Sequence, residues 1–474
     1  MVLAYVIVFP YFERLNNPNE NARVWTTRAL ATHGTFAIEG VEREWGEVSD
    51  RATDGKHHYA AKAPGTALLG VPVAVVQGKL GTPSKRATTW ALRVFTVALP
   101  LAFFLLIFAR AVERETGSPA ARDLLVLGLG VGTMMYPYGL AFVGHAQAAA
   151  LLFGGYLAAR AQRPALAGLL VALSVVFEYQ ALFAALAVAG YAVFLFRRQS
   201  WRFVLGGLGP ALLLAAFHTA LFGRPWETPV AHSDDPVFRL YHAQGLLGFT
   251  HPRPEVLVKS LVSLDYGLFV WSPFLLAGLG AAVAGLARAR RRADWAVIAA
   301  VTVLMLLFLS GLSNWRGGWC AGGPRYVAAV VPFLVWAVAL SWSFWQRQPL
   351  VGAALGGLVL ASVAACLLAG AHFPHYPLQL DDPLFDLTLP LLGEGFAPYS
   401  LGRLIGLRGL LSYLPLGLAV LAAVVLALRP LGKLAAIGVA VAVVFFAALG
   451  LVNGRHTADE EHAVGFVRGV WEPK

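Results

Sequence analysis

Apolar runs of about 20 residues recur along nearly the whole chain, and this feature most restricts what the sequence can fold into. As a helix, each run is long enough to cross a hydrocarbon layer about 30 Å thick. The runs are continuous rather than alternating, which favours helices over the strands of a membrane barrel. Hydrophobic residues make up 58% of the 474 and charged residues only 13%, which excludes an ordinary soluble domain. The sequence therefore predicts an all-α, polytopic membrane protein.

The net charge of +11 is the second constraint, because strongly basic proteins often bind nucleic acid. Here the arginines stand in short clusters between apolar runs, where they set the orientation of the spans. No basic stripe carries interleaved aromatic residues, so we expect no nucleic-acid partner. The two cysteines, Cys320 and Cys366, have neither CxxC nor zinc-binding spacing. This favours two buried thiols over a single disulfide near the outer face. The oligomeric state is not indicated by the pattern.

Arginine clusters near residues 110–122, 160–163, 197–202 and 288–292 are predicted to face the cytoplasm, the side on which membrane proteins concentrate positive charge. Two spans fit between successive clusters. With these anchors the chain predicts about 13 transmembrane helices, the first of them within residues 1–12. That first segment is shorter than the roughly 17 residues that a span needs, so we expect a tilted, thin crossing or a start further upstream.

Residues 64–80 are an exception. If they crossed the membrane, the charged stretch before them would lie in the cytoplasm with the arginine clusters. They contain Pro64, Gly65, Gly70 and Pro72, and interrupted helices are tolerated where protein covers them. A horizontal or re-entrant helix removes the conflict. Residues 13–86 then form one large extracytoplasmic loop that contains juxtamembrane helices.

We predict a division of the chain at residue 222. Residues 1–222 hold the first span, the outer loop and spans 2 to 7. Residues 223–474 hold a further outer loop and the C-terminal spans, with outer loops at 313–325 and 371–410.

The stretch ENARVWTTRAL in the first loop predicts a surface helix, with Asn17 and Pro18 as the signal for its start. Glu20 and Arg23 are three residues apart and share one face of one turn. From spacing alone we favour a structural interpretation, in which Glu20 interacts with the helix dipole and forms a local ion pair with Arg23. The functional alternative assigns them to a site on the loop.

The stretch DGKHHYAAKAPG holds two further candidates. Asp54 begins a turn, and Lys62 precedes Pro-Gly at the mouth of the helix predicted at 64–80. At the membrane surface Lys62 could bind an anionic headgroup, or it could simply extend its ammonium group to water. His57 and His58 are adjacent and point apart in a helix or strand, so we expect no shared metal site.

The loop WRGGWCAGGPR is the most specific motif. Its four glycines can bring backbone N–H groups together around an anion. Arg316 and Arg325 add planar donors suited to phosphate. We favour phosphate binding over the alternative, a tight turn with interfacial tryptophans.

His145, Glu178 and Asp265 lie at predicted outer turns. Ionisable groups near the membrane interior are candidates for function by default, but a helix end among lipid headgroups explains them equally well. The motifs GxxxxGK[ST], GxSxG and HExxH are absent, so we expect no cofactor and no metal, and the substrate must supply any energy.

The order of these motifs resembles that of the GT-C glycosyltransferases. It comprises a first span, a loop helix with an acidic residue three before an arginine, a Lys-x-Pro, and an arginine entering the next span in WALRVF (Arg93). It is most similar to the bacterial branch of protein mannosyltransferases, lipid A aminoarabinose transferases and RgtA/B/C/D-like enzymes. The resemblance covers residues 10 to 330.

The resemblance implies a multi-pass cell-membrane enzyme that transfers a sugar from a polyprenyl-phosphate donor at the extracytoplasmic face, with inversion. Glu20 would orient or deprotonate the acceptor, Arg23 would follow it in the site, and Lys62 would bind the donor headgroup. The family often has Asp-Glu near Glu20 and an aspartate before the lysine, and this chain has neither. Asp50 and Asp54 therefore remain rival catalytic carboxylates.

Two other functions stay open. A lipid or glycan transporter would commonly show repeated halves, and no clear internal repeat is visible. A polysaccharide ligase or polymerase would use a late outer loop, for which residues 371–410 are the candidate. That loop contains His372, His375, Asp381 and Asp382. The pattern does not specify the sugar, the acceptor or the lipid length.

Overall fold

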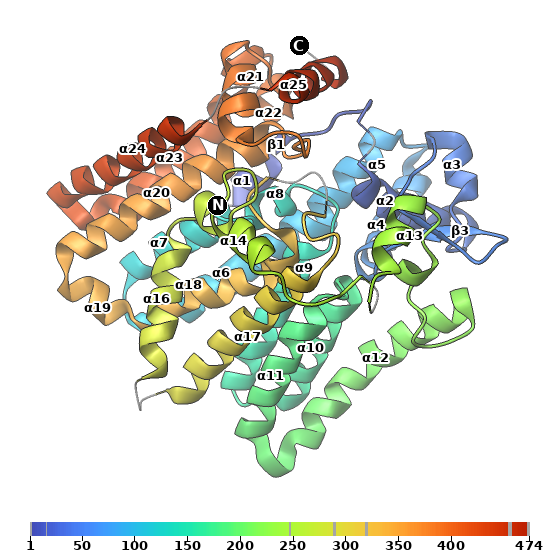
Figure 1. Ribbon diagram of the computed structural model, residues 1–474, viewed down its shortest axis with the longest axis horizontal. Coiled ribbons are helices and arrows are strands. Elements are labelled where there is room, and N and C mark those ends of the chain that lie inside the picture. Colours follow the sequence, from blue (N-terminus) through green and yellow to red (C-terminus); the bar gives the residue numbers. More distant parts are fainter. Residues whose placement is uncertain are drawn as a thin grey trace.

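The computed structural model describes residues 2–15, 17–245, 248–287, 291–317, 321–453 and 457–471, which are mostly helical (Figure 1). Two predicted features lie partly outside the described residues. They are the glycine-rich loop, with Gly318, Trp319 and Cys320, and one arginine cluster, with Arg288 and Arg290.

Five helical segments are long and apolar enough to cross a membrane, as the apolar runs predict. Two of them each contain two long helices. Shorter apolar helices lie between them, and the total of 13 spans stays a prediction. The five segments are Lys85–Thr116, Ala181–Phe222 (α11, Ala181–Phe196, and α12, Ser200–Phe222), Arg292–Gly311 (α17), Pro349–His372 (α20) and Gly409–Val452 (α23, Leu414–Leu428, and α24, Ala435–Val452).

The first apolar segment differs from the prediction. Only α1 (Val2–Val6) is helical, and at 1.5 Å per residue five residues rise about 8 Å. The chain then extends into β1 (Val8–Phe9), which pairs antiparallel with β4 (Tyr399–Ser400). Pro10 follows and has no N–H with which to continue a helix. The prediction that residues 1–12 form a crossing helix is therefore wrong.

The charged loop after this segment folds into short elements at one end of the molecule. Helix α2 (Pro18–His33) begins after Asn17, as predicted, and ends at Gly34, which has the left-handed conformation that favours glycine. Helix α4 (Gly65–Leu80) packs against α2 and rises about 24 Å, less than the hydrocarbon layer. Its horizontal or re-entrant placement stays a prediction. Between them lie α3 (Glu39–Trp45), β2 (Arg51–Thr53) and β3 (His58–Ala60).

The main hydrophobic core joins helices from both parts of the chain. Phe153 packs edge-on against Phe333 and Trp336, with ring centroids 5.1 and 5.8 Å apart. These large side chains are fully buried and hold the helices together around one centre. The helices are α6 (Leu99–Thr116), α7 (Pro119–Val131), α9 (His145–Arg160), α11, α17, α18 (Val331–Leu340) and α20.

Three segments that the topology places on one side of the membrane meet at one end of these helices. Arg160 pairs with Glu115 at 3.0 Å and with Asp294 at 3.3 Å, and Arg291 pairs with Glu115 as well. The Glu115, Arg160 and Asp294 side chains come from α6, α9 and α17. That this end faces the cytoplasm stays a prediction.

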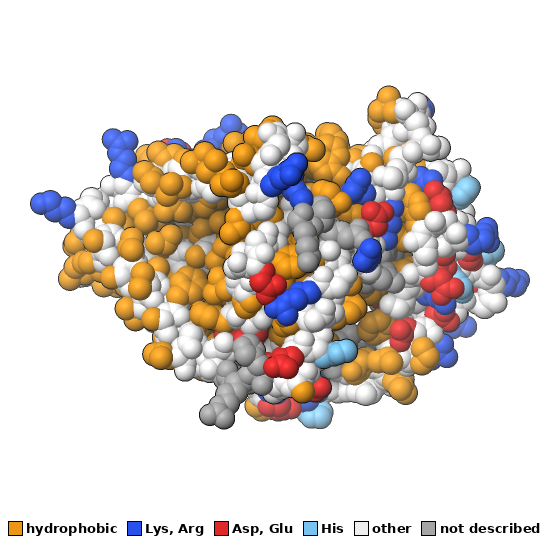
Figure 2. All heavy atoms as spheres, turned by 90° about the horizontal axis from the view of Figure 1, so that it is seen from above, with side chains coloured by type: hydrophobic (Ala, Val, Ile, Leu, Met, Phe, Trp, Pro, Cys, Tyr) orange, Lys and Arg blue, Asp and Glu red, His pale blue; other side chains and the backbone are white. Residues whose placement is uncertain are grey.

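Apolar and charged side chains are separated on the surface of the molecule. Figure 2 shows that apolar side chains dominate one half of the visible face, whereas charged side chains gather on the other half. The charged half lies over the end of the molecule that carries α2, α3, β3 and α13 (Pro236–His242) in Figure 1. The molecule thus has an apolar part, suited to contact with lipid, and a polar end.

Candidate active site

Glu20, on the first turn of α2, is only 2% exposed and forms a two-pronged ion pair. Nε and Nη2 of Arg93 donate to its two oxygens at 2.7 and 2.6 Å, and the Phe142 N–H donates to Oε1 at 2.6 Å. Burial raises the pKa of Glu20, but the charge and hydrogen bonds of Arg93 and the Phe142 N–H outweigh it, so the pKa lies below its ordinary value. Glu20 is therefore an ionised, fixed acceptor and a weak base.

Arg23, one turn further along α2, is 1% exposed and pairs with a different carboxylate. Its Nη2 donates to Glu178 Oε1 at 2.6 Å, and its Nη1 donates to the Asn19 carbonyl at 2.9 Å. Glu178 also accepts from the Gly144 N–H at 3.1 Å. The local Glu20–Arg23 pair that spacing favours is not formed, since both side chains reach partners on other helices. The predicted local ion pair is therefore wrong, whereas Glu20 does lie in the first turn of the helix.

Lys62 lies between β3 and α4, and its Nζ is 2.5 Å from Asp50 Oδ2. Burial lowers the pKa of Lys62, as do the nearby charges of Arg23 and Arg325, whereas Asp50 opposes the shift. Two arginines thus lie close enough to Lys62 to act on its charge. Asp50 is the direct partner of the predicted headgroup lysine.

Arg325 and His145 complete the cluster. Arg325 is buried at the start of η4 (Arg325–Val330), with its guanidinium 5.2 Å from the centre of the Tyr326 ring. His145 begins α9, and its Nδ1 is 3.6 Å from Glu178 Oε1. Within the described residues, Arg23 Nε and His145 Nε2 are buried without a hydrogen-bond partner. Buried atoms of this kind are rare unless a ligand or water satisfies them.

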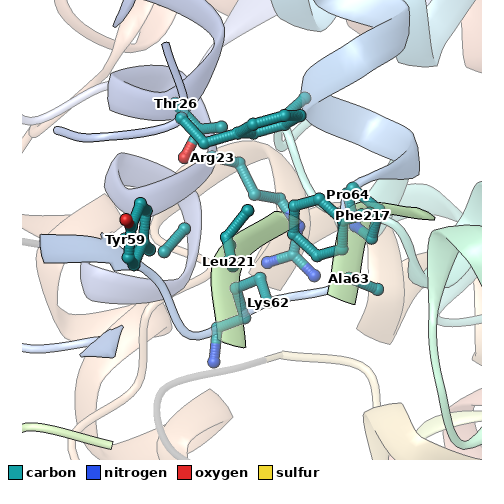
Figure 3. Close-up of a pocket in the computed structure, with 11 residues that line it drawn as sticks. Arg23, Thr26, Tyr59, Lys62, Ala63, Pro64, Phe217 and Leu221 are labelled. Atoms are coloured by element: carbon teal, nitrogen blue, oxygen red, sulfur yellow. The ribbon is translucent and has the colours of Figure 1, made fainter. Parts of the chain in front are cut away.

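A first pocket opens beside Arg23 and Lys62 (Figure 3). Its remaining wall is apolar and includes side chains from α12, so a pair of cations faces a hydrophobic surface. The wall consists of Phe36, Ala60, Ala63, Pro64, Ala67, Phe217 and Leu221, with Thr26 and Tyr59 at its edge.

A second pocket lies beside Asn19 and Arg325. Asn19 also accepts a hydrogen bond from Arg23 through its side chain, which places this pocket next to the first. His375 of the late loop 371–410 contributes to it, so that loop and the first loop meet at one site. The other lining residues are Asn17, Pro137, Tyr138, Ala141, Val143, Ala321 and Pro374.

The structure does not bring all the sequence candidates together. Asp54 sits in the turn between β2 and β3, where its Oδ1 accepts from the N–H groups of Lys56 and His57 at 2.8 and 2.7 Å. These bonds hold the pKa of Asp54 below its ordinary range, and its carboxylate serves an exposed turn. Arg316 pairs with Asp265 and lines neither pocket.

Three residues of this site had other assignments from the sequence: Arg93 belonged to the order of motifs, Asn17 marked the start of the loop helix, and His375 belonged to the late loop 371–410. Arg93 had a detectable signal, because an arginine inside an apolar run is a candidate for function by default. It also starts η1 (Arg93–Ala98), a π-helical stretch of the kind that often marks functional positions. His375 lies 355 residues after Glu20 in the sequence, and no spacing rule connects them.

Comparison with known proteins gives only distant likenesses. No protein family matches the sequence, and no curated protein matches it significantly. The structure has a distant likeness to two solved structures. For ArnT from Cupriavidus metallidurans bound to undecaprenyl phosphate, the TM-score is 0.45 with 15% identity, over 95% of this chain and 75% of that one. For the Archaeoglobus fulgidus oligosaccharyltransferase in the apo form, it is 0.41 with 13% identity, over 79% and 53%. Because both scores lie below 0.5, the proposals below rest on this chain's own residues.

Proposed function

We propose that this protein is a multi-pass membrane glycosyltransferase that moves a sugar from a polyprenyl-phosphate donor to an acceptor hydroxyl or amine at the extracytoplasmic face. One observation carries the proposal: Arg23 and Lys62 line a pocket whose opposite wall is apolar. A ligand that is anionic at one end and hydrophobic at the other satisfies both walls. A polyprenyl phosphate has this composition.

The charges of the site support a bound phosphate. Four cations and three carboxylates meet there, and a phosphodiester carries one negative charge. Arginine can grip two phosphate oxygens at once, while lysine acts as a point charge. The cations are Arg23, Lys62, Arg93 and Arg325, and the carboxylates are Glu20, Asp50 and Glu178.

The hydrophobic wall supports a lipid tail. Phe217 and Leu221 belong to α12, and most of the apolar side chains along that helix are exposed. A lipid tail that passes these residues could continue along the exposed apolar side chains of α12. In the proposed orientation, with about 13 spans, this surface faces the lipid.

The reaction is a single displacement. The acceptor oxygen or nitrogen attacks the anomeric carbon, the bond from that carbon to the phosphate oxygen breaks, and its electron pair passes to the phosphate. Lys62 and the arginines stabilise the charge that develops there. Attack opposite the leaving phosphate inverts the anomeric carbon. Glu20 orients the acceptor as an ionised hydrogen-bond acceptor and receives its proton late, because its low pKa makes it a weak base in the ground state.

The proposal is tested by donor binding. The full chain in detergent is titrated with a short-chain polyprenyl phosphate, and Lys62→Met is compared with Lys56→Met, a lysine exposed in the neighbouring hairpin. We expect Lys62→Met to raise Kd at least about tenfold, or about 1.4 kcal/mol, and Lys56→Met to leave it unchanged. Equal affinities of the two variants, or no binding by the unaltered chain, would contradict the proposal.

One observation favours a second candidate, a polysaccharide ligase or polymerase. His375 of loop 371–410 lines the second pocket, and such enzymes were expected to use this loop. The two candidate functions differ in which residue the reaction requires. If His375→Gln abolishes transfer while Glu20→Ala leaves it intact, the ligase is favoured.

A further inference from the structure

The second pocket has an unusual charge pattern for a polar cavity. Asparagine, tyrosine, histidine and Arg325 provide its polar side chains, and no described lining residue is a carboxylate. Glu20 and Glu178, two carboxylates of the site, are already engaged. Both oxygens of Glu20 accept hydrogen bonds from Arg93, and Glu178 accepts from Arg23.

We propose that this pocket binds the sugar ring of the donor and selects an uncharged sugar over a cationic amino sugar. The inference rests on the proposed function, since it presumes a phosphate at Lys62 and Arg23. It adds a substrate class that the motifs of the sequence do not specify.

The position of the pocket assigns it to the donor sugar. In a polyprenyl-phosphate donor the ring is joined directly to the phosphate, so the ring must lie next to the phosphate cations. Arg325 lines the second pocket, and its charge acts on Lys62, which lines the first. Asn19 lines the second pocket and accepts from Arg23 of the first. A ligand can therefore place its phosphate at the first pocket and its ring in the second.

Asn17 and His375 supply hydrogen-bonding groups suited to hydroxyls. Asn17 precedes α2 at the position where a side chain usually caps the helix, but its side chain makes no capping bond. Its amide nitrogen instead lies 3.4 Å from His375 Nδ1. With Nδ1 as the acceptor, the ring proton of His375 is on Nε2. Burial lowers the pKa of His375 to about 4, so the ring is neutral at pH 7.

A cationic sugar would meet unfavourable surroundings in this pocket. Its ammonium group would approach Arg325 with no free carboxylate among the described lining residues. Charge repulsion in a partly buried site is weakly screened, so it acts on the bound ring more strongly than it would in water. A hydroxyl at the same ring position meets carboxamide and imidazole groups instead.

The test uses the full chain in detergent and three synthetic short-chain donors. Two differ only in one ring hydroxyl, which is replaced by an amine, and the third carries a carboxylate in place of the exocyclic alcohol. We expect the neutral donor to bind at least about tenfold more tightly than the amino donor, or about 1.4 kcal/mol. We expect the carboxylate donor to bind at least as tightly as the neutral donor, because its charge is opposite to that of Arg325. Equal binding of neutral and amino donors, or preference for the amino donor, overturns the inference.

A single substitution should move the preference. Asn17→Asp adds a carboxylate to the pocket, and aspartate starts helices as well as asparagine does, so α2 is retained. We expect the ratio of neutral to amino donor affinities to fall at least about threefold. His375→Gln should weaken binding of the neutral donor at least about threefold, whereas His462→Gln, on the exposed face of α25 (Ala458–Val470), should not. An unchanged ratio in Asn17→Asp, or equal effects of the two histidine changes, contradicts the inference.

These measurements separate the inference from the proposed function. If donors bind with dependence on Lys62 but without regard to ring charge, the proposed function stands and the inference fails. If no donor binds, both fail.

Discussion

Two buried charge clusters lie far apart in this protein and differ in how completely their atoms are satisfied. The end cluster comprises Glu115, Arg160, Asp294, Tyr156 and Tyr191 and ties together α6, α9, α11 and α17. In it, Asp294 accepts from both tyrosine hydroxyls at 2.8 Å. None of its buried polar atoms is without a partner within the described residues, and neither described pocket touches it.

The site cluster has the opposite character. It comprises Glu20, Arg23, Lys62, Arg93, Glu178 and Arg325 with His145. Two pockets open beside it, and within the described residues Arg23 Nε and His145 Nε2 have no partner. Burying charges is costly, so a fully satisfied cluster is explained by the helices it holds together. A cluster with unsatisfied atoms and adjoining pockets is explained by a ligand. Burial of charge alone therefore does not distinguish a structural cluster from a functional one here. What distinguishes them is whether each buried polar atom has a hydrogen-bond partner.

The largest effect is expected at Glu20. Glu20→Gln keeps the shape but removes the charge that orients the acceptor, so we expect turnover to fall at least about 10²-fold. Donor affinity should stay within about threefold, because the donor phosphate is held by other residues. Turnover is measured as release of polyprenyl phosphate from labelled donor in membranes. Glu461→Gln, exposed on α25, is the control.

Glu20→Gln also leaves Arg93 without its ion partner, and losing one member of a buried pair costs about 3–5 kcal/mol of stability. Thermal unfolding of the variant must therefore be measured beside its activity. Full activity in Glu20→Gln, together with loss in Asp50→Asn or Asp54→Asn, would transfer the catalytic role to one of those carboxylates.

The second prediction sets the two clusters against each other. Arg23→Met should raise the donor Kd about tenfold, because Arg23 lines the phosphate pocket. Arg160→Met should leave donor affinity unchanged and lower stability by about 1–3 kcal/mol, because it removes partners of Glu115 and Asp294. Donor titration and thermal unfolding are measured for both. If Arg160→Met weakens donor binding as much as Arg23→Met does, the distinction between the clusters is wrong.

The same contrast shows what the sequence could and could not predict. Local signals worked: Asn17 and Pro18 mark the start of α2, and the apolar runs indicated a helical membrane protein. Pairing between distant residues was out of reach. Glu20 and Arg23 share a turn, yet their partners Arg93 and Glu178 lie 73 and 155 positions away. Spacing reports only neighbours on one element, so it favoured a local pair that the packing of α2 against other helices excludes.

The third prediction concerns pH and separates Lys62 from the other cations. Its pKa in the folded protein is lowered by burial and by Arg23 and Arg325, below the roughly 10.4 of an unfolded lysine. As the pH rises through the lowered value, Lys62 loses its charge, so kcat/KM should fall several-fold. Between the two pKa values the unfolded chain binds more protons, so stability should rise with pH in this window.

Activity and stability should thus move in opposite directions with alkaline pH. Lys62→Arg keeps its charge throughout, because the pKa of arginine exceeds 12, and should remove both trends while it retains part of the activity. The measurements are kcat/KM and the midpoint of urea unfolding from pH 7 to 10.5. If the alkaline loss of kcat/KM is unchanged in Lys62→Arg, it arises from another group.

The smallest effect is expected at Arg316, and the measurement tests which arginines belong to the site cluster. Sequence reasoning placed Arg316 beside Arg325 at the donor phosphate, but Arg316 pairs with Asp265, is partly exposed and lines neither pocket. Partly exposed ion pairs contribute about 0–1 kcal/mol. We therefore expect Arg316→Met to change the donor Kd by less than about threefold. Arg325→Lys should raise the donor Kd at least about tenfold although the charge is kept, because lysine cannot bind two phosphate oxygens at once. Arg347→Lys, exposed on α19 (Trp342–Arg347), is the control for Arg325→Lys. A loss in Arg316→Met as large as that in Arg325→Lys would show that the glycine-rich loop brings both arginines to the phosphate when the donor binds.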